Sequence, residues 1–166
     1  MSKEKTGFEK ISGAVRIIFL ATRLSIFMLV FVGYLVIETP EAVTQGISTE
    51  HLIMISIFSM LALSNTIVPI MLKKVFLSKL LKEEKEPAKL LQSWQVHHII
   101  YFALAESIAI FGFVLGFLVH RKLIPIVFGI WAIIVFQIMC PDYAALKNRY
   151  AELLSENGSA AEESFD

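Results

Sequence analysis

Four apolar stretches, each long enough to cross a lipid bilayer, dominate the sequence. They cover residues 17–37, 52–72, 96–119 and 123–140, and short charged segments separate them. A transmembrane helix needs about 20 predominantly apolar residues to cross a hydrocarbon core of about 30 Å. Backbone groups inside hydrocarbon must find their hydrogen bonds within the segment, so each stretch is expected to be an α-helix. The sequence therefore predicts an all-α, polytopic membrane protein with a bundle of four transmembrane helices at residues 17–140.

Composition agrees with a lipid-embedded protein and argues against several other classes. Of the 166 residues, 56% are hydrophobic, whereas soluble domains have about 45–50%. Acidic and basic residues balance at 15 each, so the charge does not favour nucleic acid as a partner. The single cysteine, Cys140, excludes an intrachain disulfide and a cysteine-based metal cluster. With no nucleophile–base pair, phosphate loop or set of metal ligands evident, we expect no enzymatic activity, no metal and no cofactor.

The segments outside the spans are predicted to extend the bundle on one side. Residues 1–16 fit either a short amphipathic helix on the membrane surface or a solvated terminus. Residues 73–95 contain six lysines and predict a helical hairpin, broken near Pro87, which would occupy the first turn of a new helix. Residues 141–156 have apolar positions at helical spacing and predict an amphipathic helix. Residues 157–166 are small and acidic and are predicted to be disordered.

The distribution of basic residues predicts the orientation of the chain. Four basic residues precede the first span, ending with Arg16, six lie in residues 73–95, and two follow the fourth span. On the opposite side lie only Arg121 and Lys122. Because basic residues accumulate in cytoplasmic loops, twelve against two places both termini and the middle hairpin in the cytoplasm.

An ionisable residue interrupts the third apolar stretch. Glu106 lies ten residues after Val96, which is about 15 Å along a helix and close to the middle of the bilayer. A carboxyl group at that depth is costly, so it is a functional-site hypothesis, here reversible protonation or cation binding. His98 is then a candidate for passing a proton to Glu106, because imidazole changes its charge near neutral pH. Interfacial, solvated positions for His97 and His98 are the more ordinary interpretation.

Each of the other spans contributes one strongly polar side chain: Arg23, Asn65 and Gln137. By residue count these lie about 5–10 Å closer to the cytoplasm than Glu106. Polar groups that face lipid stay unsatisfied, so the four side chains are expected to converge in one layer. In a purely structural interpretation, Glu106 pairs with Arg23 or forms a hydrogen bond with Asn65 or Gln137. Arg23 could instead extend its guanidinium back to the lipid headgroups.

Small residues form a stripe on the third span beside Glu106. At about 100° per residue, they project onto one side of the helix, and they are Ala105, Ala109, Gly112 and Gly116. Small side chains let the backbones of two membrane helices approach closely. The stripe is therefore predicted to be a helix-packing surface, through which the protein could form a homo-oligomer.

The stretch Ala103–Leu118 resembles the carboxylate-bearing helix of the rotor-ring (c) subunit of rotary ATP synthases and ATPases. In that resemblance, Glu106 matches the ion-carrying carboxylate, Ser107 matches the position beside it, and Gly112 matches a glycine that follows. The layout of the whole chain resembles a group of small four-span bacterial membrane proteins that share this segment. These resemblances imply a bacterial inner (plasma) membrane protein with an ion- or proton-binding carboxylate.

Two functions from different classes follow from these patterns. The first is a proton- or ion-linked membrane protein, possibly part of an oligomer, with Glu106, Ser107, Arg23, Asn65, Gln137 and His98 as candidate site residues. The second is a non-catalytic structural or assembly factor of a membrane complex, which acts through its cytoplasmic helices at residues 73–95 and 141–154. A charge change at Glu106 would impair the first function, and charge reversal in the middle hairpin would impair the second.

Overall fold

The computed structural model describes residues 2–38, 48–77, 79–80 and 84–163, and within these residues the regular structure is entirely helical. Four helical segments are long and apolar enough to cross a membrane. The predicted all-α bundle of four membrane-spanning helices is therefore confirmed. In chain order the helices are α1 (Ser2–Val36), α2 (Thr49–Leu72), the π-helix η2 (Lys73–Leu77), α4 (Pro87–Leu118), α5 (Leu123–Ile138) and α6 (Tyr143–Glu163).

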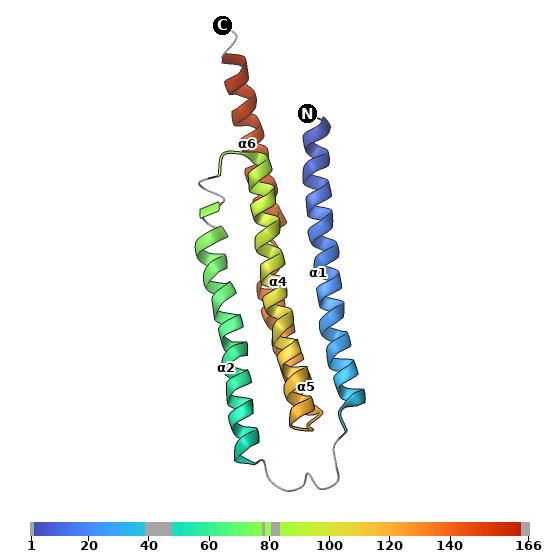
Figure 1. Cartoon of the computed structure of the whole chain (residues 1–166). Coiled ribbons are helices and arrows are strands. Elements are labelled where there is room, and N and C mark those ends of the chain that lie inside the picture. The colour runs from blue at the N-terminus through green and yellow to red at the C-terminus, as the bar shows by residue number, and fades with distance from the viewer. Residues whose placement is uncertain (1, 39–47, 78, 81–83, 164–166) are drawn as a thin grey trace.

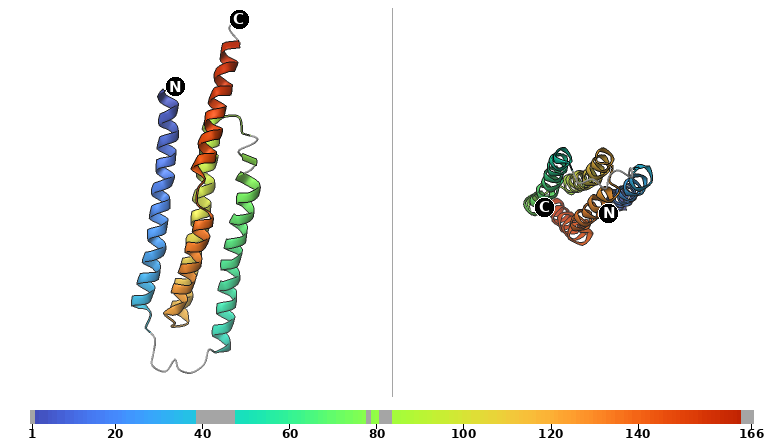
Figure 2. Two further views of the ribbon diagram at one scale, coloured as in Figure 1. Left: turned by 180° about the vertical axis from the view of Figure 1, so that it is seen from behind. Right: turned by 90° about the horizontal axis from the view of Figure 1, so that it is seen from below.

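Helix α4 is the centre of the bundle. It packs against α5, α1, α2 and α6, and α1 also packs against α5 (Figure 1). Helices α1 and α2 lie on opposite sides of the α4–α5 pair, as the view from behind and the end-on view also show (Figure 2). The N- and C-terminal ends lie at the same end of the bundle. Any orientation that places one terminus in the cytoplasm therefore places the other there too.

Aromatic side chains form the core where α1, α4 and α5 meet. The ring of Phe102 on α4 lies 5.6 Å from that of Phe19 and 5.1 Å from that of Phe136, and the rings of Phe19 and Phe136 stack at 4.5 Å. Such pairs contribute about 0.5–1.5 kcal/mol beyond the area that they bury. They hold α1 and α5 at fixed positions on α4.

Large apolar side chains cover the outer surface of the peripheral helices. Leu24 and Phe31 on α1 are 63% and 57% exposed, and Met60 on α2 is 73% exposed. A soluble monomer rarely exposes apolar surface on this scale. The outer faces of these helices are therefore in contact with lipid, and the chain is a multi-pass membrane protein.

Helix α1 runs without interruption through the predicted boundary between residues 16 and 17. Its 35 residues extend for about 52 Å, and the hydrocarbon core accounts for only about 30 Å of that length. The first part of α1 therefore continues beyond the hydrocarbon as a helix.

The turn between α4 and α5 is short, because α4 ends at Leu118 and α5 begins at Leu123. Val119 caps α4, and His120 adopts a left-handed conformation with φ 52°. The amide of Arg121 donates to the carbonyl of Gly116 at 3.0 Å, and the amide of His120 donates to that of Phe117 at 3.4 Å. These two bonds form the Schellman pattern, in which a left-handed residue satisfies the last carbonyls of a helix. Glycine is usual at that position, and here histidine occupies it.

The region predicted as a helical hairpin has a π-helical turn instead of a simple extension of α2. Lys73, the first residue of η2, donates through Nζ to the carbonyl of Ile138 at 2.7 Å. This bond satisfies a carbonyl at the C-terminus of α5, where a positive charge is favourable. Helix α4 begins at Pro87, whose missing N–H costs nothing in a first turn. Residues 78 and 81–83 of the predicted hairpin lie outside the described residues.

Helix α6 is longer than the sequence predicts. The end expected at residue 157 is wrong, because the helix continues to Glu163 through a segment predicted to be disordered. A glycine inside a helix costs only about 1 kcal/mol, and the Ala- and Glu-rich sequence that follows has high helix propensity. Residues 164–166 lie outside the described part of the chain.

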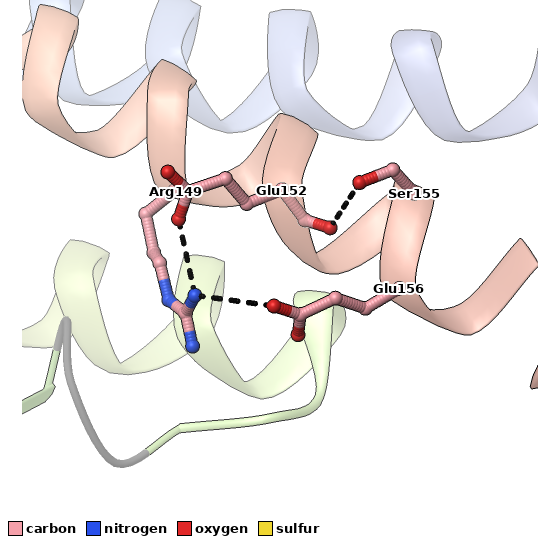
Figure 3. Close-up of polar contacts among 4 residues, drawn as sticks. All are labelled: Arg149, Glu152, Ser155 and Glu156. Carbon is pink, nitrogen blue, oxygen red and sulfur yellow. Dashed lines mark hydrogen bonds and ion pairs between the residues drawn. The ribbon is translucent and has the colours of Figure 1, made fainter. Parts of the chain in front are cut away.

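Helix α6 buries one face and pairs charges on the other. Leu146 and Leu153 are 1% exposed. Arg149 pairs with Glu152 at 3.1 Å and with Glu156 at 3.9 Å (Figure 3). Exposed pairs of this kind add only a few tenths of a kcal/mol each, so the buried face is the main attachment of α6 to the bundle.

Candidate functional site

Glu106 lies at the contact between α4 and α1. The hydroxyl of Ser25 on α1 donates to Oε1 of Glu106, and both side chains are partly buried. A hydrogen bond between two membrane helices contributes about 0.6 kcal/mol on average. The carboxyl group, costly in hydrocarbon, is thereby held by a partner from a neighbouring helix.

The next residue along α4 makes the corresponding contact with α2. Asn65 donates through Nδ2 to the hydroxyl of Ser107 at 2.6 Å, and Ser107 donates in turn to the carbonyl of Leu104 at 2.7 Å. Consecutive helix residues point about 100° apart. Glu106 and Ser107 therefore attach α4 to two different helices at one level of the bundle.

These two residues border the lipid-facing side of α4. With Glu106 at 0° and Ser107 at about 100°, a projection at 3.6 residues per turn places Ile99, Ala103 and Ile110 between them, and all three are exposed. Helix α5 covers the other side of α4 through the small-residue stripe. The carboxyl group of Glu106 therefore lies at the boundary between the protein and the lipid, beside the α1 contact.

Arg23 and Gln137 do not join this layer, so the predicted convergence of four polar side chains is corrected. Gln137 is exposed on α5. The buried face of that helix contains Ala132, Val135 and Phe136, and position 137 lies outside that face. Arg23 is partly buried, and no ion pair joins it to Glu106 in the described part of the chain. It lies two positions before the Glu106 partner on α1, which turns it about 200° away.

The hydrogen-bond partner of Glu106 that sequence reasoning missed is Ser25. The depth of Ser25 in the membrane is the sequence feature that could have indicated this contact. Ser25 lies eight residues after Ile17, or about 12 Å along the helix. Glu106 lies at a depth of about 15 Å and Arg23 at a depth of about 9 Å. Ser25 therefore lies closer in depth to Glu106 than Arg23 does. A hydroxyl in a membrane helix usually returns its hydrogen bond to its own backbone, which is why Ser25 attracts no attention in the sequence alone.

His98 is buried, and the expectation of a solvated histidine at this position is wrong. Its side chain is 0% exposed, and its Nδ1 lies 2.8 Å from the carbonyl of Trp94 one turn earlier. The rings of Trp94, Tyr101 and Phe102 surround it at centroid distances of 4.2, 5.8 and 6.1 Å. Glu106 lies eight positions after His98, which is about 12 Å along the helix, so the two groups are not in contact.

The small-residue stripe packs against α5 of the same chain. Ala105, Ala109, Gly112 and Gly116 are all buried. A Cβ on Gly112 would lie 2.2 Å from the Cβ of Phe128, and one on Gly116 would lie 2.5 Å from Cδ of Pro125. The stripe is thus filled by α5 and is not a surface for a second copy of the chain, which corrects the expected oligomer contact.

Comparison with protein-family models, with curated proteins and with solved structures found no match. Among the residues that the structure describes, no group of three or more His, Cys, Asp or Glu side chains could hold a metal ion. The two interhelical hydrogen bonds bring together one carboxyl group, two hydroxyl groups and one amide at this level of the bundle. This set can bind a proton or exchange hydrogen bonds.

Proposed function

We propose that this protein binds a proton, or a small cation in its place, reversibly at Glu106 within the bilayer. The observation that supports the proposal is the contact of the Glu106 carboxyl group with the Ser25 hydroxyl at the edge of the lipid-facing strip of α4. An ionisable residue inside a membrane protein is rare and commonly marks an ion or proton pathway.

The chemistry of the two partners suits a group that changes its protonation state. A serine hydroxyl can donate to a carboxylate and can accept from a carboxylic acid. Ser25 can therefore keep a hydrogen bond to Glu106 in both states by rotating its O–H. The neighbouring Asn65–Ser107 bond fixes the adjacent helix independently of that change.

The position of Glu106 at the lipid boundary favours exchange with a neighbouring membrane component. A carboxyl group beside an exposed strip can reach a partner helix or a second copy of the chain. The resemblance of Ala103–Leu118 to the carboxylate helix of rotor-ring subunits supports the same function. We place the protein in a bacterial inner membrane with both termini in the cytoplasm, where the excess of basic residues favours them.

A structural or assembly role is the second candidate, and the same two contacts favour it. Ser25 and Asn65 link the peripheral helices α1 and α2 to α4 at one level. If this linkage is the whole purpose of the layer, Glu106 need never change its charge. The projecting helix α6 would then provide the working surface (Figure 1).

Carbodiimide modification across pH separates these two functions. A carbodiimide adds to a protonated carboxyl group: the acid proton moves to a carbodiimide nitrogen and the carboxyl oxygen bonds to the central carbon. We expect Glu106 in the lipid-reconstituted chain to react while it carries a proton and to stop reacting as the pH is raised and the proton leaves. Glu106→Gln should remove the modified species, and Ser25→Ala should change its pH dependence. If Glu106 does not react, or reacts equally at every pH, the proton-binding proposal fails.

A further inference from the structure

A groove runs between the first part of α1 and α6, at the end of the bundle that holds both termini. It has a volume of about 540 Å³ and receives Phe8 and Arg16 from α1 and Lys147 and Tyr150 from α6. The rings of Phe8 and Tyr150 lie 5.6 Å apart across it. A cavity of this size is in the range that holds a small organic ligand.

A second, smaller cavity adjoins the groove on the side of the membrane span. It has a volume of about 250 Å³ and is lined by Phe19, Leu20 and Cys140, with an apolar surface. Arg16 and Tyr143 border both cavities. The guanidinium of Arg16 lies 5.0 Å from the centre of the Tyr143 ring, and this contact holds the charge at the junction of a polar and an apolar space.

The depth of this junction corresponds to the level of the lipid headgroups. Arg16 lies 20 residues before Val36, the last residue of α1. That interval is about 30 Å of helix, which equals the thickness of the hydrocarbon core. The smaller cavity therefore lies at the edge of the hydrocarbon, and the larger groove lies in the headgroup region.

Two basic groups of the groove form no ion pair with the residues that the structure describes. Arg149 on α6 is paired with Glu152 and Glu156 (Figure 3). By contrast, neither Arg16 nor Lys147 forms an ion pair in the described part of the chain. Glu9 is the acidic side chain that lines the groove, so the lining has a net positive charge.

We propose that this groove binds an anionic phospholipid. The phosphate lies against Arg16 and Lys147, and one acyl chain enters the smaller apolar cavity beside Leu20. Guanidinium groups suit phosphate oxygens because their N–H donors form two parallel hydrogen bonds. The site is separate from Glu106 and does not depend on the function proposed for that residue.

Native mass spectrometry of the full chain in detergent tests the site, with dioleoyl phosphatidylglycerol as the probe. Each basic residue near an anionic lipid strengthens binding by about fivefold. We expect Arg16→Gln and Lys147→Gln each to weaken binding by about that factor, and Glu9→Gln to strengthen it. Lys85→Gln is the matched control, because it removes the same charge from an exposed position outside the groove and should leave binding unchanged.

Three results would overturn the proposal. The first is an equal loss in Lys85→Gln, which would indicate general attraction between the surface and anionic lipid. The second is equal binding of dioleoyl phosphatidylcholine, and the third is equal binding of glycerol phosphate, which has no acyl chains. Thermal unfolding of each variant without added lipid identifies any variant that has lost its fold, and Lys147→Gln and Glu9→Gln, both exposed, then decide the matter.

Discussion

The contact of α4 with α5 makes Gly112 the position where a single methyl group has the best-defined effect. A Cβ there would lie 2.2 Å from the Cβ and 2.8 Å from the Cγ of Phe128, whereas ordinary contacts are 3.4–4 Å. The Cβ of Phe128 is bonded to the backbone and cannot rotate away. The two helices must therefore move apart by about 1 Å, in an interior with few voids to absorb the shift.

The expected cost follows from two opposing effects. Overpacking costs about 1–3 kcal/mol, and replacing glycine by alanine in a helix gains about 1 kcal/mol. For Gly112→Ala we predict a net loss of up to about 2 kcal/mol. In a chain of this size, 1 kcal/mol shifts the unfolding midpoint by about 2–4 °C, so the midpoint should fall by up to about 8 °C.

Gly13 provides the matched control on α1. A Cβ added at Gly13 would have no atom within 4 Å among the described residues outside its own helical turn, so only the gain in helix propensity remains. We predict that Gly13→Ala raises the midpoint by about 2–4 °C. The assay is thermal unfolding of both variants in one detergent, followed by circular dichroism. If both substitutions raise the midpoint, the α4–α5 contact is looser than described and the reasoning is refuted.

Three further predictions test other contacts. In a double-mutant cycle with Asn65→Ala and Ser107→Ala, unfolding should give a coupling of about 0.6 kcal/mol, up to about 1.7, and a coupling of zero would contradict the hydrogen bond. Lys73→Gln should destabilise the chain by about 1 kcal/mol, since Nζ bonds a carbonyl at the end of α5, and an unchanged midpoint in unfolding would argue against that bond. The orientation can be tested with Ser155→Cys and Thr49→Cys in a chain whose native cysteine is replaced by alanine. In intact cells, a membrane-impermeant thiol reagent should modify the cysteine at position 49 and leave the one at position 155 unmodified. The reverse pattern would show that the orientation is inverted.

The sequence predicts the helical bundle well because length and apolarity alone decide which segments cross a bilayer. The tight turn before Leu123 and the helix start at Pro87 also follow from local chemistry. The end of α6 does not follow from local chemistry. Glycine at position 158 marks a helix end only when the residues after it favour a non-helical structure. The Ala- and Glu-rich residues after it do not.

The orientation of each helix about its own axis is the part that sequence alone could not supply. In a soluble helix, the contrast between polar and apolar faces reveals the buried side. In lipid both faces are apolar, so that contrast is lost for α5, and Gln137 could not be placed. The same uncertainty favoured Arg23 over Ser25 as the partner of Glu106, because a strong charge attracts attention and a small hydroxyl does not. His98 is misplaced for a related reason, since its burial depends on which face of α4 turns toward the rest of the bundle.

The most direct test of the account is a titration of the Glu106 carboxyl group itself. Infrared difference spectra of the full chain in lipid bilayers record the C=O stretching band of a protonated carboxyl group as the pH is changed. The account predicts a band that appears and disappears reversibly as the pH is changed, is missing in Glu106→Gln and shifts in Ser25→Ala. Identical spectra for the wild type and Glu106→Gln would contradict it.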